Sequence, residues 1–92
     1  FKLNIIKEVS GRKNFPNSVI LNKATINSQE VNKDDIFFAI KGKKNDGNKF
    51  VKQSFKRKAA LAVVNKIHRD CNIERQIKVK NTLEFLIHFK FT

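Results

Sequence analysis

The chain is poor in the residues that stabilise small secreted domains. Its 92 residues include one cysteine, one proline and three glycines, and tryptophan, tyrosine and methionine are absent. A single thiol, Cys71, excludes an internal disulfide framework and is typical of a reducing compartment, so we expect a cytoplasmic protein. No apolar run approaches the roughly 18 residues of a membrane-spanning helix, and we expect no membrane partner. The length leaves room for one small domain.

Acidic residues are also scarce: 8 Asp and Glu stand against 20 Lys and Arg, which gives a net charge of +12. Such a charge is typical of a nucleic-acid-binding module. However, Lys, Asn, Ile and Phe supply 46 of the 92 residues, and all four have AT-rich codons, so genome composition alone can raise the lysine content. Base-reading surfaces also prefer arginine, and only 4 of the 20 cations are arginines. A basic nucleic-acid-binding module is therefore the less favoured alternative, and nucleic acid is not the expected partner.

The spacing of apolar residues predicts an α/β domain. The runs 36–41 and 60–64 are typical of buried strands, and segment 49–58 between them is typical of a helix with Asn48 as its N-cap. These three segments form a parallel βαβ unit. Asn81 and Glu84 have the spacing of a capping box at the start of a closing helix. We expect a small mixed sheet of about four to five short strands with helices packed on it.

Further elements are expected from the same patterns. A helix is predicted over 3–10, and extended segments over 18–22, 24–27 and 76–79. The side chains expected to face the core are Phe37, Ile40, Val63, Phe50, Val51, Ser54, Phe55, Leu83, Leu86 and Ile87. Because the chain starts at Phe1 and stops at Thr92 within an apolar helical pattern, we expect residues 1–92 to be a single domain of a longer protein.

Groups that carry out catalysis are few. His68 and Cys71 are the one close pair of soft metal ligands, and no second pair completes a four-ligand set. The serines have no histidine near them in sequence. We therefore expect no catalytic residue and no metal site in these 92 residues.

Gly42 and Gly47 follow a predicted strand and open a predicted helix, with the spacing of a nucleotide P-loop. A P-loop needs Lys and then Ser or Thr after its second glycine, whereas Asn48 and Lys49 stand here. The start of a helix still favours an anion or a polar sugar. Residues 41–58 carry eight basic side chains and one acid, Asp46, so a solvated lysine-rich face is the alternative interpretation.

Several segments have a recognisable common spacing: NSQ at 27–29, DDIFFAIKG at 34–42, DGNKFV at 46–51, KAALAVV at 58–64 and IKVKNTLEFL at 77–86. Together they resemble the N-terminal domain of the Mur ligases, which extend the peptidoglycan peptide. The corresponding family segments are, in the same order, a D-S-R triplet, GDLFVALKG, DGHDFI, GAxAVV and V-x-D-T-L-x-A-L. The resemblance spans residues 20–90.

The resemblance implies a set of substrate-binding residues. The hydroxyl of Ser28 matches the triplet serine and is expected to hydrogen-bond the diphosphate of a UDP-sugar. Asn27 and Gln29 stand where the family has Asp and Arg, so two charged contacts become neutral amides. Asn48 replaces a histidine, which stacks better on uracil. The complete implied set is Asn27, Ser28, Gln29, Lys41, Gly42, Asp46, Gly47 and Asn48. At the end of the helix, Lys58 or Ala59 stands where the family usually has a glycine.

The tail Asn81-Thr82-Leu83 resembles most the branch that adds D-alanyl-D-alanine to UDP-N-acetylmuramoyl-tripeptide. The alternative is the branch that adds the third amino acid, which tends to carry an arginine there. In both branches the first domain binds the UDP-sugar end, the central domain binds ATP and magnesium, and the last domain presents the incoming group.

The resemblance therefore implies a parent enzyme that is an ATP-dependent carbon–nitrogen ligase of cell-wall synthesis. It implies no cofactor and no catalytic ATP domain within these 92 residues. The implied partners are UDP-N-acetylmuramoyl-tripeptide and the central and C-terminal domains of the same chain.

Overall fold

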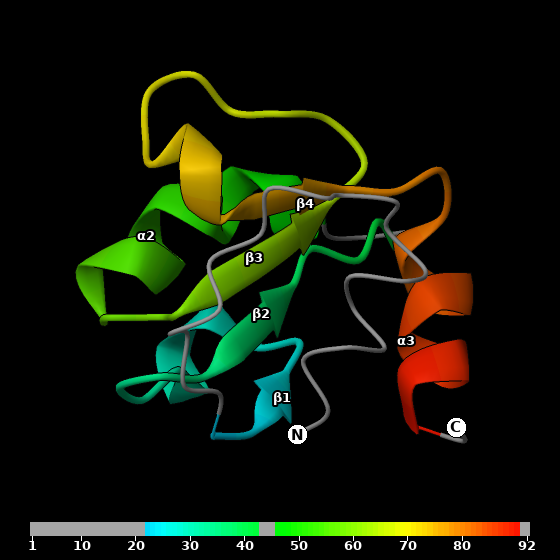
Figure 1. Ribbon diagram of the computed structural model, residues 1–92, viewed down its shortest axis with the longest axis horizontal. Helices are drawn as coiled ribbons and strands as arrows, with labels where there is room; N and C mark the ends of the chain where they lie inside the picture. The colour runs from blue at the N-terminus through cyan, green and yellow to red at the C-terminus, as the bar shows by residue number, and fades with distance from the viewer. Residues whose placement is uncertain (1–21, 43–45, 91–92) are drawn as a thin grey trace.

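The computed structural model describes residues 22–42 and 46–90. Within them, one sheet is built from β1 (Ala24–Thr25), β2 (Ile36–Phe38), β3 (Leu61–Val64) and β4 (Gln76–Lys78), paired in chain order (Figure 1). The α/β class and the βαβ unit are confirmed. All three strand pairings are parallel. The sheet formed by these four strands is therefore parallel, and our expectation of a mixed sheet is wrong for the described residues. Each connection crosses over the sheet and returns the chain in the same direction.

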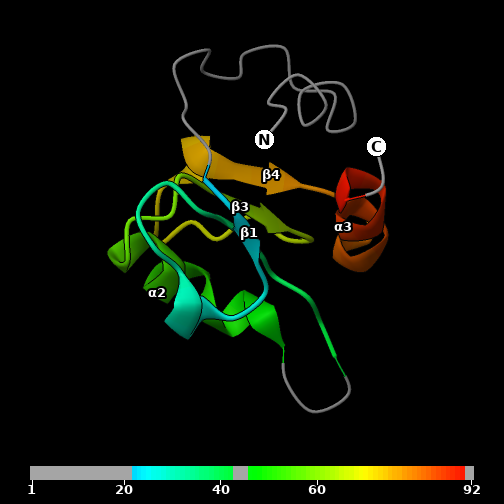
Figure 2. The same ribbon diagram turned by 90° about the horizontal axis from the view of Figure 1, so that it is seen from below.

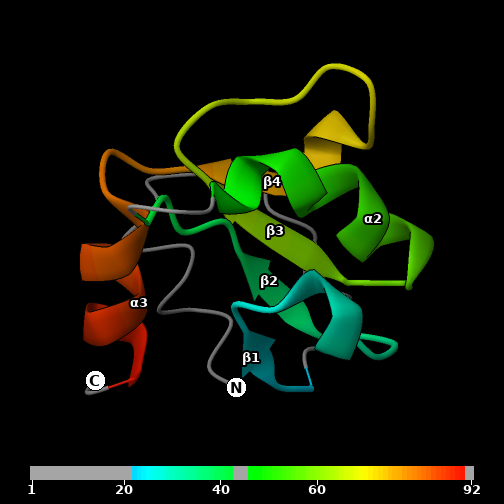
Figure 3. The same cartoon turned by 180° about the vertical axis from the view of Figure 1, so that it is seen from behind.

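The connections are mostly short helices. Strand β1 leads to the 3₁₀ helix η1 (Ser28–Glu30), and β2 leads to η2 (Gly47–Phe50) and α2 (Val51–Lys56). Strand β3 leads to η3 (Ile73–Arg75), and β4 leads to α3 (Thr82–Lys90). Figure 3 shows η1 beside α2 in front of the sheet, whereas Figure 2 shows α2 and α3 apart, with the strands between them. No helix in these two ranges is long and apolar enough to cross a membrane.

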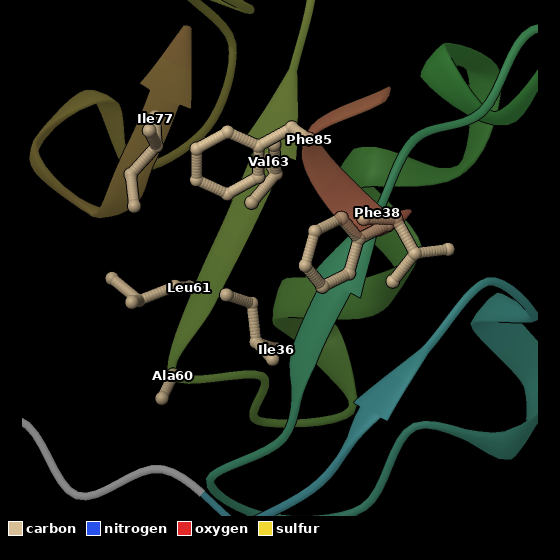
Figure 4. Close-up of a cluster of buried hydrophobic side chains, with 8 residues drawn as sticks. Ile36, Phe38, Ala60, Leu61, Val63, Ile77 and Phe85 are labelled. Atoms are coloured by element: carbon tan, nitrogen blue, oxygen red, sulfur yellow. The ribbon is translucent and has the colours of Figure 1, made fainter. Parts of the chain in front are cut away.

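Alternation along the strands divides the core into two layers. Because successive strand residues face opposite sides, Ile36 and Phe38 pack toward α3 whereas Phe37 packs toward α2. On the α3 side, Phe85 lies against Phe38 with ring centroids 6.1 Å apart (Figure 4). On the α2 side, Val51 packs with Phe37 and Ala62. Burial on both faces explains why the two central strands, β2 and β3, are wholly apolar.

The expected core is confirmed for Phe37, Val63, Val51, Ser54 and Leu86. It is wrong for the three side chains that are exposed: Phe50 at 39%, and Leu83 and Ile87 at 50% each. On α3 the inward stripe runs through Thr82, Phe85 and Leu86, whose i, i+3 and i+4 spacing leaves Leu83 and Ile87 outside it. Ile40 and Phe55 are half-buried. The predicted helix 3–10 and most of the predicted strand 18–22 lie outside the described residues.

The start of the predicted helix differs from our expectation. Asp46, and not Asn48, is the cap, because its carboxylate accepts a hydrogen bond from the backbone N–H of Asn48 at 3.0 Å. The chain then forms η2 before α2 begins at Val51. At α3 the cap is as predicted, since Asn81 Oδ1 accepts from the N–H of Glu84 at 3.1 Å.

Helix α2 ends with a lysine in the left-handed conformation. Lys58 has φ of 70°, its N–H donates to Phe55 O at 3.0 Å, and the N–H of Ala59 donates to Ser54 O at 3.0 Å. This pair of bonds is a Schellman motif, in which glycine is the usual residue at the left-handed position. Lys58 therefore occupies the left-handed position where glycine is usual, and its Cβ makes this turn strained.

A buried carboxylate joins the amino-terminal ends of β1 and β2. Asp35 has no exposed surface, and it accepts hydrogen bonds from the Lys23 ammonium, the N–H of Asn32 at 2.7 Å and the N–H of Lys23 at 3.3 Å. Burial raises the pKa of Asp35, but the Lys23 ammonium and the two N–H groups outweigh it, so the pKa of this carboxyl is lowered overall. The backbone oxygen of Asp35 accepts a hydrogen bond from the N–H of Ala60 at 2.7 Å. Asp35 is therefore also bonded to the residue just before β3.

Replacing the buried carboxylate makes stability depend less on pH. Because the pKa of Asp35 is lower in the folded chain, its contribution is fully present above about pH 4 and is lost as the pH falls through the folded pKa. We expect Asp35→Asn to lower the free energy of unfolding by about 1.5–3 kcal/mol at pH 7, and by much less at pH 2.5. Urea unfolding at both pH values measures this. Asp34→Asn, which removes the adjacent carboxylate outside this cluster, is the control and should change stability by under about 0.5 kcal/mol.

Glycine at position 58 should relieve the strained turn. Lys58→Gly is expected to raise the free energy of unfolding by about 0.5–1 kcal/mol, because the left-handed conformation no longer includes a Cβ clash. Lys52→Gly, at an exposed position within α2, should lower it by about 1 kcal/mol. Thermal melts of the two variants measure both effects. A lower melting temperature of Lys58→Gly than of the unchanged chain would show that the backbone at Lys58 is not strained.

Candidate functional site

The carboxyl ends of β1 and β2 lie side by side at one edge of the sheet, because these strands are parallel neighbours. Segment 26–29 follows β1. The loop that contains Gly42 and Gly47, called the glycine loop, follows β2. A surface pocket of about 440 Å³ lies where they meet. Its lining residues are Ile26, Asn27, Ser28, Gln29, Ile40, Gly47 and Phe50. The structure thus brings the N-S-Q segment and the second loop glycine together, at the edge where α/β proteins commonly bind ligands.

The polar wall of this pocket is fixed by local hydrogen bonds. The side chain of Asn27 accepts from the N–H of Gln29 at 3.0 Å and thereby caps η1, while its own N–H donates to Thr25 Oγ1 at 3.1 Å. The buried hydroxyl of Ser28 donates to Gln53 Oε1 on α2 at 3.1 Å. The Gln29 side chain is exposed. Asn27 therefore shapes the backbone, and Ser28 is held in place by a residue 25 positions later in the chain.

Gly47 is required because two backbone segments approach each other closely. Its N–H donates to Ile40 O at 2.8 Å, and a Cβ added here would lie 2.7 Å from Ile40 N and 3.0 Å from the Ala39 backbone. The Ala39 carbonyl also accepts from the buried Thr82 hydroxyl at 2.9 Å, which attaches the start of α3 to the same place. The pocket floor is therefore rigidly tied to the end of β2.

A chain of side chains supports the other wall. Asn48 Nδ2 donates to Asp46 Oδ1 at 2.8 Å, and His68 Nε2 lies 3.1 Å from Asn48 Oδ1. Since the carboxylate of Asp46 accepts from the amide nitrogen, the amide oxygen of Asn48 faces His68, so the imidazole is the donor in that bond. The hydrogen bonds from Asn48 chiefly lower the pKa of Asp46, with a smaller contribution from the charges of Lys41 and Lys49. Asp46 therefore remains a carboxylate that caps η2.

His68 is itself held by the buried side chain of Gln76. Its N–H donates to Gln76 Oε1 at 2.7 Å, and Gln76 Nε2 donates to His68 O at 2.8 Å and to Cys71 Sγ at 3.4 Å. Burial and the neighbouring Asp70 raise the pKa of the Cys71 thiol. The imidazole is directed to Asn48 and not to the thiol. Within ranges 22–42 and 46–90, no three His, Cys, Asp or Glu residues gather as a metal site.

Several side chains of this candidate site were not predicted from sequence. Ile26 and Phe50 are exposed at 60% and 39% and form an apolar wall of the pocket, although Phe50 was assigned to the core. Gln53 and His68 act through contacts between distant segments, and no sequence motif marks them. Of the eight predicted residues, Asn27, Ser28, Gln29 and Gly47 line this pocket. Lys41, Gly42, Asp46 and Asn48 do not line it, although Lys41 lines a second pocket.

Residues 21–89 match the family model described as "Mur ligase family, catalytic domain". The chain belongs to the Mur ligase family. Over 57 residues it is 40% identical to UDP-N-acetylmuramoyl-L-alanyl-D-glutamate--2,6-diaminopimelate ligase of Rickettsia rickettsii, a match that covers 62% of this chain and 12% of that ligase. The ligase of the same name from Clostridium tetani is 37% identical over 62 residues, which is 64% of this chain and 13% of the relative. The chain thus spans about an eighth of the length of these curated relatives.

Solved Mur ligases have the same fold. A crystal structure of MurF from Acinetobacter baumannii superposes with a TM-score of 0.74 over 89% of this chain and 18% of that one, at 21% identity. The crystal structure of MurF from Thermotoga maritima in complex with ADP superposes with a TM-score of 0.67. This match covers 79% of this chain and 17% of that one, at 23% sequence identity. At these identities the likeness concerns the fold.

A methyl group at position 47 should disturb the pocket of this Mur ligase chain. We expect Gly47→Ala to lower the free energy of unfolding by about 1–3 kcal/mol, because the added Cβ meets backbone atoms that cannot move aside easily. Lys49→Ala, an exposed change in the same 3₁₀ helix, should have an effect below about 0.5 kcal/mol. Chemical denaturation of both variants checks this, and equal effects would show that the approach is not tight.

Proposed function

We propose that this chain is the UDP-sugar-binding N-terminal domain of an ATP-dependent ligase that adds the third amino acid to UDP-N-acetylmuramoyl-L-alanyl-D-glutamate. The observation that carries the proposal is the pocket where segment 26–29 meets the second loop glycine. Membership of the Mur ligase family and the names of the curated relatives support the substrate and the reaction.

The pocket has the chemistry of a nucleotide site. Phe50 and Ile26 offer exposed apolar surface to a planar base, and an aromatic ring is a suitable platform for stacking. The amide nitrogen of the Gln29 side chain offers a donor to the diphosphate, and the Ser28 hydroxyl becomes a second donor when its proton turns from Gln53 Oε1 to the ligand. In this proposal Gly47 allows close approach of the backbone, while Asp46 and Asn48 hold η2 in place and do not contact the ligand directly.

The branch that adds D-alanyl-D-alanine is the second candidate. Its support is the Asn81-Thr82-Leu83 tail and the fold shared with MurF structures. The curated relatives, at 37–40% identity, carry the name of the diaminopimelate-adding enzyme. Because these identities exceed those to the MurF structures, we place the third-residue ligase first.

The described residues do not fit ATP and magnesium. After Gly47 the chain has Asn48, whose side chain is engaged by Asp46 and His68, so neither the lysine nor the hydroxyl of a P-loop is present there. In the proposed parent enzyme, a central domain holds ATP and magnesium and the last domain presents the amino acid. The parent works in the cytoplasm, where nucleotide-linked precursors are made.

An NMR titration with uridine and UDP tests the proposal. We expect amide signals of Asn27–Gln29 and Gly47–Phe50 to shift together, with a weak affinity, about millimolar, since the charged pair of the family triplet is replaced by amides. A nucleic-acid module would behave differently: oligonucleotides would bind at micromolar concentration, with a steep dependence on salt and shifts at the lysines of α2. That result, with no UDP shifts in the pocket, would overturn the proposal.

Ser28 and Gln53 give a matched pair of variants for the same titration. Ser28→Ala should weaken UDP binding by about 0.5–1.5 kcal/mol, because it removes a hydroxyl that contacts the ligand. Gln53→Ala breaks the same Ser28–Gln53 hydrogen bond but leaves the hydroxyl in place, so it should weaken binding less. Equal losses would mean that Ser28 acts only by packing η1 against α2.

A further inference from the structure

A second pocket, of about 240 Å³, lies further along the carboxyl edge of the sheet. It is formed by residues that follow β2, β3 and β4 together with the start of α3. Its lining residues are Ile40, Lys41, Asn65, Lys80, Asn81, Thr82 and Leu83. Ile40 also lines the first pocket, so the two hollows adjoin across one side chain.

The second pocket is cationic. It is lined by two lysines and by no acidic residue. The described residues form one salt bridge with one another, between Lys23 and Asp35. Neither Lys41 nor Lys80 therefore forms an ion pair with a described carboxylate. The charge of Lys41 also lowers the pKa of Asp46, a carboxylate already bonded to Asn48. Lys80 is exposed and is the less engaged of the two cations.

The neutral polar groups of this pocket also favour a ligand that accepts hydrogen bonds. The Oδ1 atom of Asn81 is occupied as the cap of α3, because it accepts from the N–H of Glu84. The Thr82 hydroxyl donates its proton to Ala39 O. The Nδ2 amide group of Asn81 makes no hydrogen bond to the described residues, and it can only donate. Ammonium and amide donors lining one hollow suit an oxyanion.

We propose that this second pocket binds an oxyanion, phosphate or carboxylate, of the same ligand whose base occupies the first pocket. The inference rests on the proposed function, because it assigns a further part of that ligand. An extended UDP-sugar precursor that starts between Ile26 and Phe50 passes over Ile40 and brings its acidic groups to Lys41 and Lys80. The precursor has two sources of oxyanion: the diphosphate and the carboxylates of the peptide.

Lys80→Gln tests the second pocket, with Lys56→Gln as its matched control. Both remove one exposed lysine and the same net charge, but Lys56 lies on α2 outside both pockets. The affinity of the full 92-residue chain is measured by NMR for uridine, UDP and UDP-N-acetylmuramoyl-L-alanyl-D-glutamate. We expect Lys80→Gln to weaken binding of the charged ligand by about three- to tenfold, to leave uridine unchanged, and to reduce the salt dependence. Lys56→Gln should change none of these by more than about 1.5-fold.

The three probes separate the possible outcomes. A loss already seen with UDP assigns the oxyanion to the diphosphate, and a loss seen only with the peptide-bearing precursor assigns it to a carboxylate. Equal effects of Lys80→Gln and Lys56→Gln, with uridine still shifting the first pocket, would overturn this inference and leave the proposed function intact. If uridine and UDP shift neither pocket, the proposed function fails and the inference fails with it.

Discussion

The arrangement of this sheet depends on the hydrogen bonds that the buried carboxylate of Asp35 accepts. This residue sits just before β2 and receives hydrogen bonds from Lys23, just before β1, and from Asn32 in the connecting turn. Its backbone oxygen receives the N–H of Ala60, just before β3. One residue therefore aligns the beginnings of three strands. An unpaired carboxylate in this position would be strongly destabilising, so the three segments must meet for the charge to be buried.

Because the amino-terminal ends of the strands are aligned, the positions of their carboxyl-terminal ends are also determined. Because the strands are parallel and only two to four residues long, their carboxyl ends emerge close together, and the segments that follow them form one surface. Both pockets lie on that surface and share Ile40. Short strands that begin level with one another thus place two adjoining pockets along one edge of the sheet in a very small domain.

The walls of this edge are supported by contacts between distant parts of the chain. Gln76 holds His68, His68 holds Asn48, and Asn48 holds the cap residue Asp46, so strand β4 is connected to the wall of the first pocket. Thr82 attaches α3 to the end of β2 in the same way. These bonds order the loops that follow each strand. The result is a surface whose loops are held by hydrogen bonds from distant segments.

The sequence by itself determined the α/β class, the βαβ unit, the cap at Asn81 and the family, since these follow from local propensity, apolar runs and motif spacing. The resemblance also placed segment 27–29 and the loop containing Gly42 and Gly47 in one set of substrate-binding residues. Tertiary structure alone decided which apolar residues are exposed, and Phe50, Leu83 and Ile87 were assigned wrongly because helical spacing does not reveal which face meets the sheet. The structure also revealed two local features that the sequence analysis did not predict, the cap at Asp46 and the left-handed Lys58, and it decided the contacts of Gln53 and His68. The contacts of Gln53 and His68 each depend on an atom contributed by a distant segment, and such a contact exists only once the parallel strands have brought the segments together.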